Sequence, residues 1–212
     1  MINMKRWEII NRIIENKGYK NYLEIGVRDG ECFKEIFCEN KIGIDPNPTS
    51  NHTTHIMTSD RFFQQIDRDQ KFDIVFIDGL HLDFQVDRDI DNSLKHLSEG
   101  GTIVLHDCNP PTKHHAAESP VFTPPANGDW NGTVYLSLIR IRLYNSNLKL
   151  ITVNDDWGVG ILTKEEVNET LNAFPNDALT WDFFNQNRNE ILNLITTEEF
   201  EKIYSNNKIV EV

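Results

Sequence analysis

Short apolar runs alternate with amphipathic segments along most of the chain. Between the third and fourth run, apolar residues recur at helical spacing from Val86 to Leu97, and Gly100 and Gly101 end that pattern. Strand–helix alternation of this kind predicts a parallel, doubly wound α/β sheet. The four runs are nearly continuous, as in strands covered on both faces, and lie at 22–25, 41–44, 72–78 and 102–107.

The rest of the pattern completes a Rossmann-like fold. The segments 148–153 and 158–163 are close enough to pair as an antiparallel hairpin, and 55–57 is predicted as one more short strand. The prediction is therefore a mainly parallel seven-stranded sheet with helices on both faces. Helices are expected over 3–17, over 30–37, through Phe62 and Ile66, through Val134 and Ile141, and in the tail at 178–204.

We interpret residues 1–212 as a single domain. It comprises an N-terminal helix at 1–19, a core at 20–165 and a helical C-terminal tail at 166–212. Five prolines and a glycine exclude a regular element from the loop at 108–130. A loop of this length in a compact domain is usually functional, so we favour a lid over the substrate. An insertion without a role is the alternative.

Composition narrows the class of partner. A net charge of -12 argues against nucleic acid, because phosphates require a basic face. No apolar run approaches the ~20 residues that span a bilayer, and the N-terminus does not resemble a secretory signal. Cys32, Cys38 and Cys108 form no CxxC pair and are interpreted as reduced thiols. We therefore expect a cytoplasmic protein with a small-molecule partner and no membrane partner; a homo-oligomer stays open.

Polar residues that could bind a ligand follow strand after strand. In open α/β sheets, ligands bind beyond the carboxyl ends of the strands, where the strand order reverses. Acidic residues at successive strand ends are hard to explain by packing, because an unpaired buried carboxylate is costly. The candidates are Glu24 with Gly26, Asp45, Ser59 with Asp60, Asp78 with His81, and His106 with Asp107.

The first of these turns favours a particular cofactor. Gly26 and Gly30 allow the backbone to approach a ligand closely, and Asp45 lies where an acidic residue accepts hydrogen bonds from ribose hydroxyls. The dinucleotide fingerprint G-x-G-x-x-G is absent, which argues against NAD and FAD. Glu24-x-Gly26 suits a cofactor with an amino group and no pyrophosphate, such as S-adenosylmethionine.

The segments YLEIGVRDG, FDIVFIDGLH, GGTIVLHD and WGVG together resemble class I S-adenosylmethionine-dependent methyltransferases. The likeness spans roughly 20–165. Most similar are the bacterial sugar O-methyltransferases of the macrocin and mycinamicin type and the cephalosporin biosynthesis methyltransferase. The resemblance implies that Glu24 and Gly26 contact the methionine moiety, that Asp45 binds the ribose, and that Ser59 and Asp60 lie near the adenine.

The resemblance also implies an active centre. Asp78 would be the first metal ligand, and His81 the general base. His106 and Asp107 stand where the sugar methyltransferases carry two adjacent acidic ligands, so Asp78, His106 and Asp107 form the candidate metal set. Imidazole is a poorer ligand than oxygen for magnesium, so magnesium, a softer ion such as manganese, or no metal all stay open.

The expected function is methyl transfer to a hydroxyl of a sugar, a glycan precursor or a glycosylated small molecule. Such a hydroxyl needs a general base, a metal ion or both. A catechol-type or other small-molecule methyltransferase is an alternative, and so is a non-catalytic cofactor-binding subunit. Trp130 and Trp157 either stack on a sugar ring or fill the core, and His114 and His115 are expected to be a solvated pair in the loop.

Overall fold

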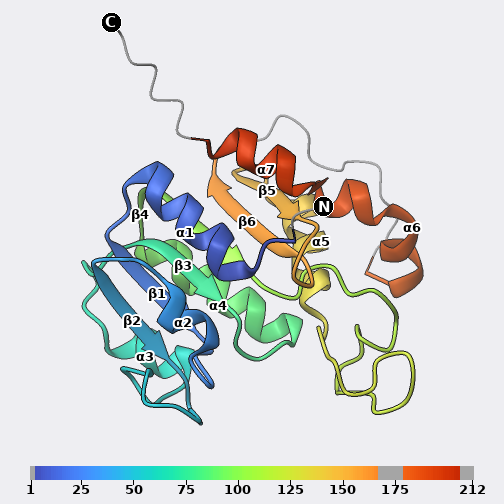
Figure 1. The fold of residues 1–212 in the computed structure, drawn as a ribbon, viewed down its shortest axis with the longest axis horizontal. Helices are drawn as coiled ribbons and strands as arrows, with labels where there is room; N and C mark the ends of the chain where they lie inside the picture. The colour runs from blue at the N-terminus through green and yellow to red at the C-terminus, as the bar shows by residue number, and fades with distance from the viewer. Residues whose placement is uncertain (1–2, 167–178, 206–212) are drawn as a thin grey trace, which may run out of the picture.

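A seven-stranded mixed sheet forms the centre of the computed structural model, which describes residues 3–166 and 179–205 (Figure 1). The strand order is β2-β1-β3-β4-β6-β5-β7. Neighbouring strands are parallel except that β6 runs antiparallel to both β4 and β5. The strands are β1 (Asn21–Ile25), β2 (Asn40–Ile44), β3 (Phe72–Ile77), β4 (Leu97–Leu105), β5 (Leu148–Val153), β6 (Val159–Lys164) and β7 (Leu194–Ile195).

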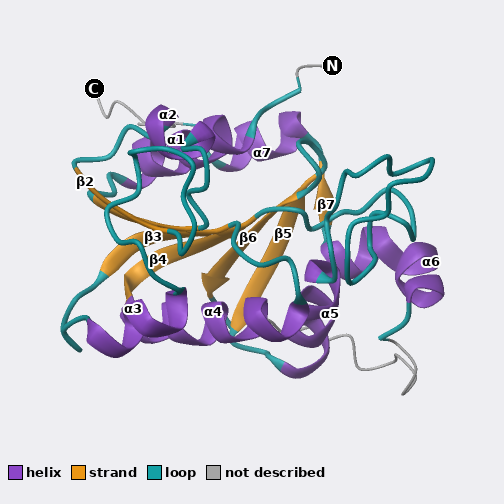
Figure 2. Ribbon diagram, turned by 90° about the horizontal axis from the view of Figure 1, so that it is seen from below, coloured by secondary structure: helices purple, strands orange, loops and turns teal. Residues whose placement is uncertain are grey.

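Helices cover both faces of this sheet, as predicted (Figure 2). The described helices on one face are α1 (Arg6–Lys17), α2 (Glu31–Glu35) and α7 (Thr197–Ile203). The described helices on the other face are α3 (Ser59–Gln65), α4 (Asp83–His96), α5 (Val134–Tyr144) and α6 (Trp181–Leu192). No helix in these two ranges of the chain is both long and apolar enough to cross a membrane.

Strand β3 shows why the predicted strands are continuously apolar. Ile74 and Phe76 belong to the core cluster beneath α1, α2 and α7, whereas Val75 and Ile77 belong to the cluster on the opposite face. Successive side chains of a strand point to opposite faces. Both faces are covered here, so both sets of positions must be apolar.

The seventh strand is not where the sequence pattern put it. Residues 55–57 form only an isolated bridge, between His55 and Ile44. The prediction of a strand there is wrong because Ile56 is 69% exposed, so the segment has little apolar surface to bury. The seventh strand is β7, within the tail that was predicted as helical. Asn193 ends α6 in a left-handed conformation, and its carbonyl accepts a hydrogen bond from Thr152 N at 3.2 Å, which places the chain beside β5.

Two other boundaries differ from the prediction. The helix expected to continue to Leu97 ends at His96, and Leu97 instead pairs with Phe72 as the first residue of β4. Residues 167–178 and 206–212 of the predicted helical tail lie outside the described residues. The loop at 108–130 contains no helix or strand, as predicted.

The strand order reverses at β1. From β1 the chain proceeds to β2 on one side, and β3 pairs on the other side. The carboxyl ends of β1 and β3 therefore border the crevice in which open α/β sheets bind ligands.

Candidate active site

One cavity of about 860 Å³ opens at these carboxyl ends. Its lining includes every site residue that was predicted from the sequence: Glu24, Gly26, Asp45, Ser59, Asp60, Asp78, His81, His106 and Asp107. The structure therefore brings residues from five separate segments together around one space.

Gly26 has a packing reason to be glycine. Its φ is +97°, and a Cβ at this position would lie 2.1 Å from the carbonyl oxygen of Asp78. No side chain fits between the ends of β1 and β3 at that distance. Because the two strand ends approach so closely, Gly26 lines the cavity with backbone atoms only. This packing requires a glycine independently of any contact with a cofactor.

Glu24 lies almost fully buried at the end of β1, only 1% exposed. Burial raises the pKa of its carboxyl to about 8, although the Tyr22 hydroxyl donates a hydrogen bond to it. The carboxyl therefore holds a proton at neutral pH. An ammonium group placed beside it would favour the ionised form.

Asp45 directly follows β2 and accepts hydrogen bonds from the backbone of the loops after β1 and β2. Its Oδ2 accepts a hydrogen bond from Arg28 N at 2.8 Å, and its Oδ1 accepts one from Asn47 N at 2.7 Å. These bonds fix the carboxylate at the cavity wall. Its predicted contact with the ribose stays a prediction.

Ser59 and Asp60 begin α3 rather than end a strand, and Thr58 caps that helix. Gln85 of α4 donates hydrogen bonds from Nε2 to Ser59 Oγ at 3.2 Å and to Asp89 Oδ1 at 3.0 Å. Burial raises the pKa of Asp89 to about 6. Gln85 and Asp89 line the cavity and were missed in the sequence; their spacing of four residues on one helix face is the signal that could have found them.

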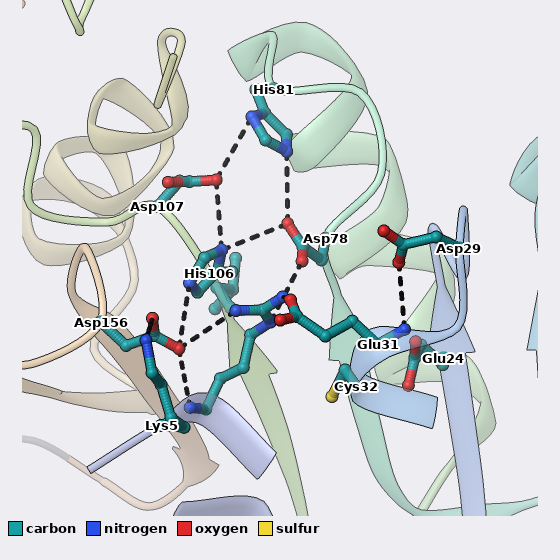
Figure 3. Close-up of polar contacts among 12 residues, drawn as sticks. Lys5, Glu24, Asp29, Glu31, Cys32, Asp78, His81, His106, Asp107 and Asp156 are labelled. Atoms are coloured by element: carbon teal, nitrogen blue, oxygen red, sulfur yellow. Dashed lines mark hydrogen bonds and ion pairs between the residues drawn. The ribbon is translucent and has the colours of Figure 1, made fainter. Parts of the chain in front are cut away.

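His81 lies between two carboxylates at one side of the cavity (Figure 3). Its Nε2 is 3.2 Å from Asp78 Oδ1, and its Nδ1 is 3.3 Å from Asp107 Oδ2 and 3.1 Å from the carbonyl oxygen of Trp130. The Trp130 ring stacks on the imidazole, with centroids 5.1 Å apart. Burial opposes a charge on His81, but the two carboxylates outweigh it and raise its pKa.

His106 joins the same two carboxylates from below (Figure 3). Its Nδ1 lies 3.4 Å from Asp78 Oδ1 and 3.2 Å from Asp107 Oδ2. Despite burial, these carboxylates raise the pKa of His106 well above its ordinary value, and that of Asp78 falls well below its own despite the same burial. Asp107 has a φ of +60°, and Asn131 Nδ2 donates a hydrogen bond to its Oδ1 at 2.7 Å. This bond leaves Oδ2 facing the two imidazoles.

The donor atoms suit a divalent ion. One atom each from Asp78, His81 and Asp107 lies within 4.8 Å of the others, and His106 Nδ1 faces the same two carboxylate oxygens. The metal ligands predicted from the sequence are Asp78, His106 and Asp107. In the structure both His81 and His106 lie close enough to the two carboxylates to act as the imidazole ligand. Mixed oxygen and imidazole donors suit manganese or a later transition metal better than magnesium.

Residues 23–108 match the family model of a methyltransferase domain. No curated protein sequence matches the chain. Solved structures that share its fold include the following three. The O-methyltransferase from Bacillus cereus in complex with SAH is 14% identical over 78% of this chain and 83% of that chain, with a TM-score of 0.52. The O-methyltransferase TomG from Streptomyces achromogenes, in complex with SAM, is 13% identical over 78% and 82%, with a TM-score of 0.55.

The third is the methyltransferase PaMTH1 from Podospora anserina, bound to SAH, which is 14% identical over 76% of this chain and 77% of that chain, with a TM-score of 0.54. Identities this low establish the fold alone. They confirm the predicted Rossmann-like sheet, and the match of residues 23–108 to a methyltransferase domain supports the predicted activity.

Two charged residues close to this site were missed in the sequence. Arg6 begins α1, and its Nη1 lies 3.2 Å from Asp156 Oδ2 in the turn between β5 and β6. Asp156 Oδ2 is also 3.7 Å from His106 Nε2. Asp156 and Trp157 have φ values of +45° and +66°, a strained backbone that is typical of functional sites. No local pattern signals a contact between residues 150 positions apart.

The loop histidines do not form a solvated pair. His114 is exposed as predicted, but His115 is buried, so the prediction is wrong for His115. The carbonyl of His115 accepts hydrogen bonds from Asn131 N and Gly132 N, both at 3.0 Å, and its ring packs on Trp157 at 5.6 Å between centroids. The loop is thereby tied to the segment that carries Trp130.

Proposed function

We propose that this chain transfers the methyl group of S-adenosylmethionine to a hydroxyl of a small acceptor. The observation that carries the proposal is His81 held between Asp78 and Asp107 at the wall of the cavity. A cofactor-binding subunit without catalysis would have no need of a half-buried imidazole between two carboxylates.

The cofactor would lie along the carboxyl ends of β1 and β2. Glu24 would meet the amino group of the methionine moiety beside Gly26, and Asp45 would accept the ribose hydroxyls. Ser59 and Asp60, with Gln85, would face the adenine. This order follows the wall of one cavity from β1 to α4.

Methyl transfer from a sulfonium is an in-line displacement, so positioning supplies much of the acceleration. The acceptor oxygen forms a bond to the methyl carbon as the carbon–sulfur bond breaks, and the hydroxyl proton must leave. His81 Nδ1 is within hydrogen-bond distance of the Trp130 carbonyl oxygen, which can only accept. Nε2 is therefore the atom of His81 that would take this proton. Asp78, 3.2 Å from Nε2, would stabilise the resulting imidazolium.

Asp78, His106 and Asp107 would hold a divalent metal ion, manganese or another imidazole-binding ion in preference to magnesium. A bound ion would lower the pKa of the acceptor hydroxyl. Arg6 stands 3.7 Å from the other oxygen of Asp78, which leaves Oδ1 directed at the two histidines.

We propose a sugar, a glycan precursor or a glycosylated small molecule as the acceptor. Trp130 and Trp157 both line the cavity, and Trp157 is 40% exposed, so its ring does not simply fill the core. Aromatic faces beside carboxylates suit a sugar, whose C–H face is apolar and whose hydroxyls donate hydrogen bonds. Asp129 and Trp130 end the 108–130 loop and line the cavity, which supports a role for this loop as the substrate lid.

The test has two stages. A thermal-shift panel compares S-adenosylmethionine, S-adenosylhomocysteine and NAD, with and without manganese or magnesium. We expect both sulfur nucleotides, and not NAD, to raise the melting temperature; if neither does, the cofactor assignment fails. Methyl transfer is then measured on panels of sugars and catechols.

His81→Ala should abolish methyl transfer and leave cofactor binding intact. His114→Ala, at an exposed position in the loop, serves as the matched control and should retain activity. Turnover that survives in His81→Ala would exclude His81 as the base. Turnover of catechols but not sugars would replace the proposed acceptor class.

A further inference from the structure

The cavity is acidic, and it contains few fixed positive charges. Among its lining residues, nine carry carboxyl groups, whereas guanidinium groups come only from Arg6 and Arg28. The Arg28 side chain belongs to an exposed residue of the loop after β1. Arg6 is only 14% exposed and lies against Asp78, next to the end of β1 where Glu24 is buried. A zwitterionic ligand at this end would find an acid and a guanidinium in the lining of the same cavity.

Arg6 is firmly held on one side and loosely on the other. Its backbone N donates to Asp156 Oδ2 at 2.8 Å, and its Nη1 lies 3.2 Å from the same oxygen. Its Nε is buried without a hydrogen-bond partner. The Nε also lies 3.7 Å from Asp78 Oδ2, beyond hydrogen-bond distance. The contact from Nη2 to Glu31 Oε2 at 2.6 Å is made by a side chain that is 53% exposed.

Glu31 reaches this contact from the first turn of α2. Its side chain extends toward Asp78 and His106 (Figure 3). A half-exposed glutamate loses conformational freedom to hold this position, and an ion pair with one exposed partner contributes little. A ligand carboxylate could therefore readily displace Glu31 from Arg6, whose guanidinium is held in place by Asp156.

We infer that Arg6 binds the α-carboxylate of the cofactor's methionine moiety, and that Glu31 occupies this place until the cofactor arrives. The inference rests on the proposed function, because it takes S-adenosylmethionine as the cofactor. Glu24 and Arg6 would then pair with the two opposite charges of the amino-acid end. On binding, the Arg6–Glu31 ion pair is exchanged for an ion pair with the ligand, and Glu31 turns to solvent.

Two ligands separate this role from a structural one. S-adenosylhomocysteine carries the amino-acid end, and 5′-methylthioadenosine lacks it. Calorimetry should show that Arg6→Gln weakens S-adenosylhomocysteine binding about 10- to 100-fold, the range for a lost hydrogen-bonded charge pair, and leaves methylthioadenosine binding unchanged. Arg12→Gln, on the same helix and paired with Glu201 away from the cavity, should change neither affinity.

Glu31→Gln tests the displaced partner in a variant that keeps Arg6. It should strengthen S-adenosylhomocysteine binding about two- to five-fold, because a weak surface ion pair no longer competes, with no effect on methylthioadenosine. Weaker or unchanged binding of S-adenosylhomocysteine by Glu31→Gln would overturn the inference. Equal losses for both ligands in Arg6→Gln would also overturn it. If the unmodified protein binds neither ligand, the proposed function itself fails.

Discussion

Glu24→Gln should change how the stability of the methyltransferase depends on pH. Burial raises the pKa of Glu24 from 4.5 to about 8. The unfolded chain releases this proton near pH 4.5, whereas the folded protein keeps it until about pH 8. Folding stability therefore falls as the pH rises through this window. Glutamine carries no charge, and its amide oxygen can accept the hydrogen bond from Tyr22, so the variant lacks this loss.

The interval from 4.5 to about 8 corresponds to a ceiling of about 5 kcal/mol, at about 1.4 kcal/mol for each pH unit. Glu24 lines the cavity, where water can solvate its ionised form. We therefore expect roughly half of the ceiling, about 2–3 kcal/mol. Glu24→Gln should lie within about 1 kcal/mol of the unmodified protein near pH 5 and exceed its stability by about 2–3 kcal/mol near pH 8.

Urea unfolding without cofactor, followed from about pH 5 to about pH 8, measures this difference, provided that the slope m is unchanged. Glu39→Gln is the control: it removes the same charge from a side chain that is 66% exposed and 3.7 Å from Lys20, and its effect should stay small at every pH. If the stability difference between Glu24→Gln and the unmodified protein does not grow with pH, Glu24 does not hold a proton in the folded state.

Three further outcomes follow from the site. If His81 is the base, turnover should rise with pH through a midpoint above the ordinary imidazole pKa of 6.5, because the carboxylates favour the protonated form that cannot accept a proton; a pH–rate profile with its midpoint at or below 6.5 would contradict this. Gly26→Ala should cost about 3 kcal/mol or more in urea unfolding, because its Cβ would meet the Asp78 carbonyl at 2.1 Å and its φ is positive; a cost under about 1 kcal/mol would show that the strands do not approach so closely. Asp45→Asn should weaken binding of S-adenosylhomocysteine by about ten-fold, as measured by calorimetry, because one oxygen that accepts from Arg28 or Asn47 becomes an amide donor; unchanged affinity would remove Asp45 from the cofactor site.

Much of the fold could be predicted because its signals are local. A strand covered on both faces is apolar at nearly every position. The strand β3 can therefore be predicted from the segment FDIVFI without knowledge of the neighbouring strands. The same holds for the polar residues at strand ends. Parallel strands bring their carboxyl ends to one edge, and Asp78 and Asp107 therefore meet although 29 positions separate them.

The errors arose where local signals are weak. The segment 55–57 contains two adjacent apolar residues, Ile56 and Met57, yet Ile56 is exposed and only one bridge forms. The two residues of β7 are too few to show a period, and they become a strand only because Asn193 turns the chain alongside β5.

The sequence by itself determined the class of fold, the loop that begins at Glu24 and the acidic strand ends, because each depends on residues a few positions apart. The tertiary structure alone decided what surrounds those residues: Trp130 stacked on His81, and Arg6 beside Asp156 across the domain. Such contacts depend on how α1, the lid loop and the β5–β6 turn pack against the sheet. Packing depends on shape and charge summed over distant segments, and no local periodicity records it.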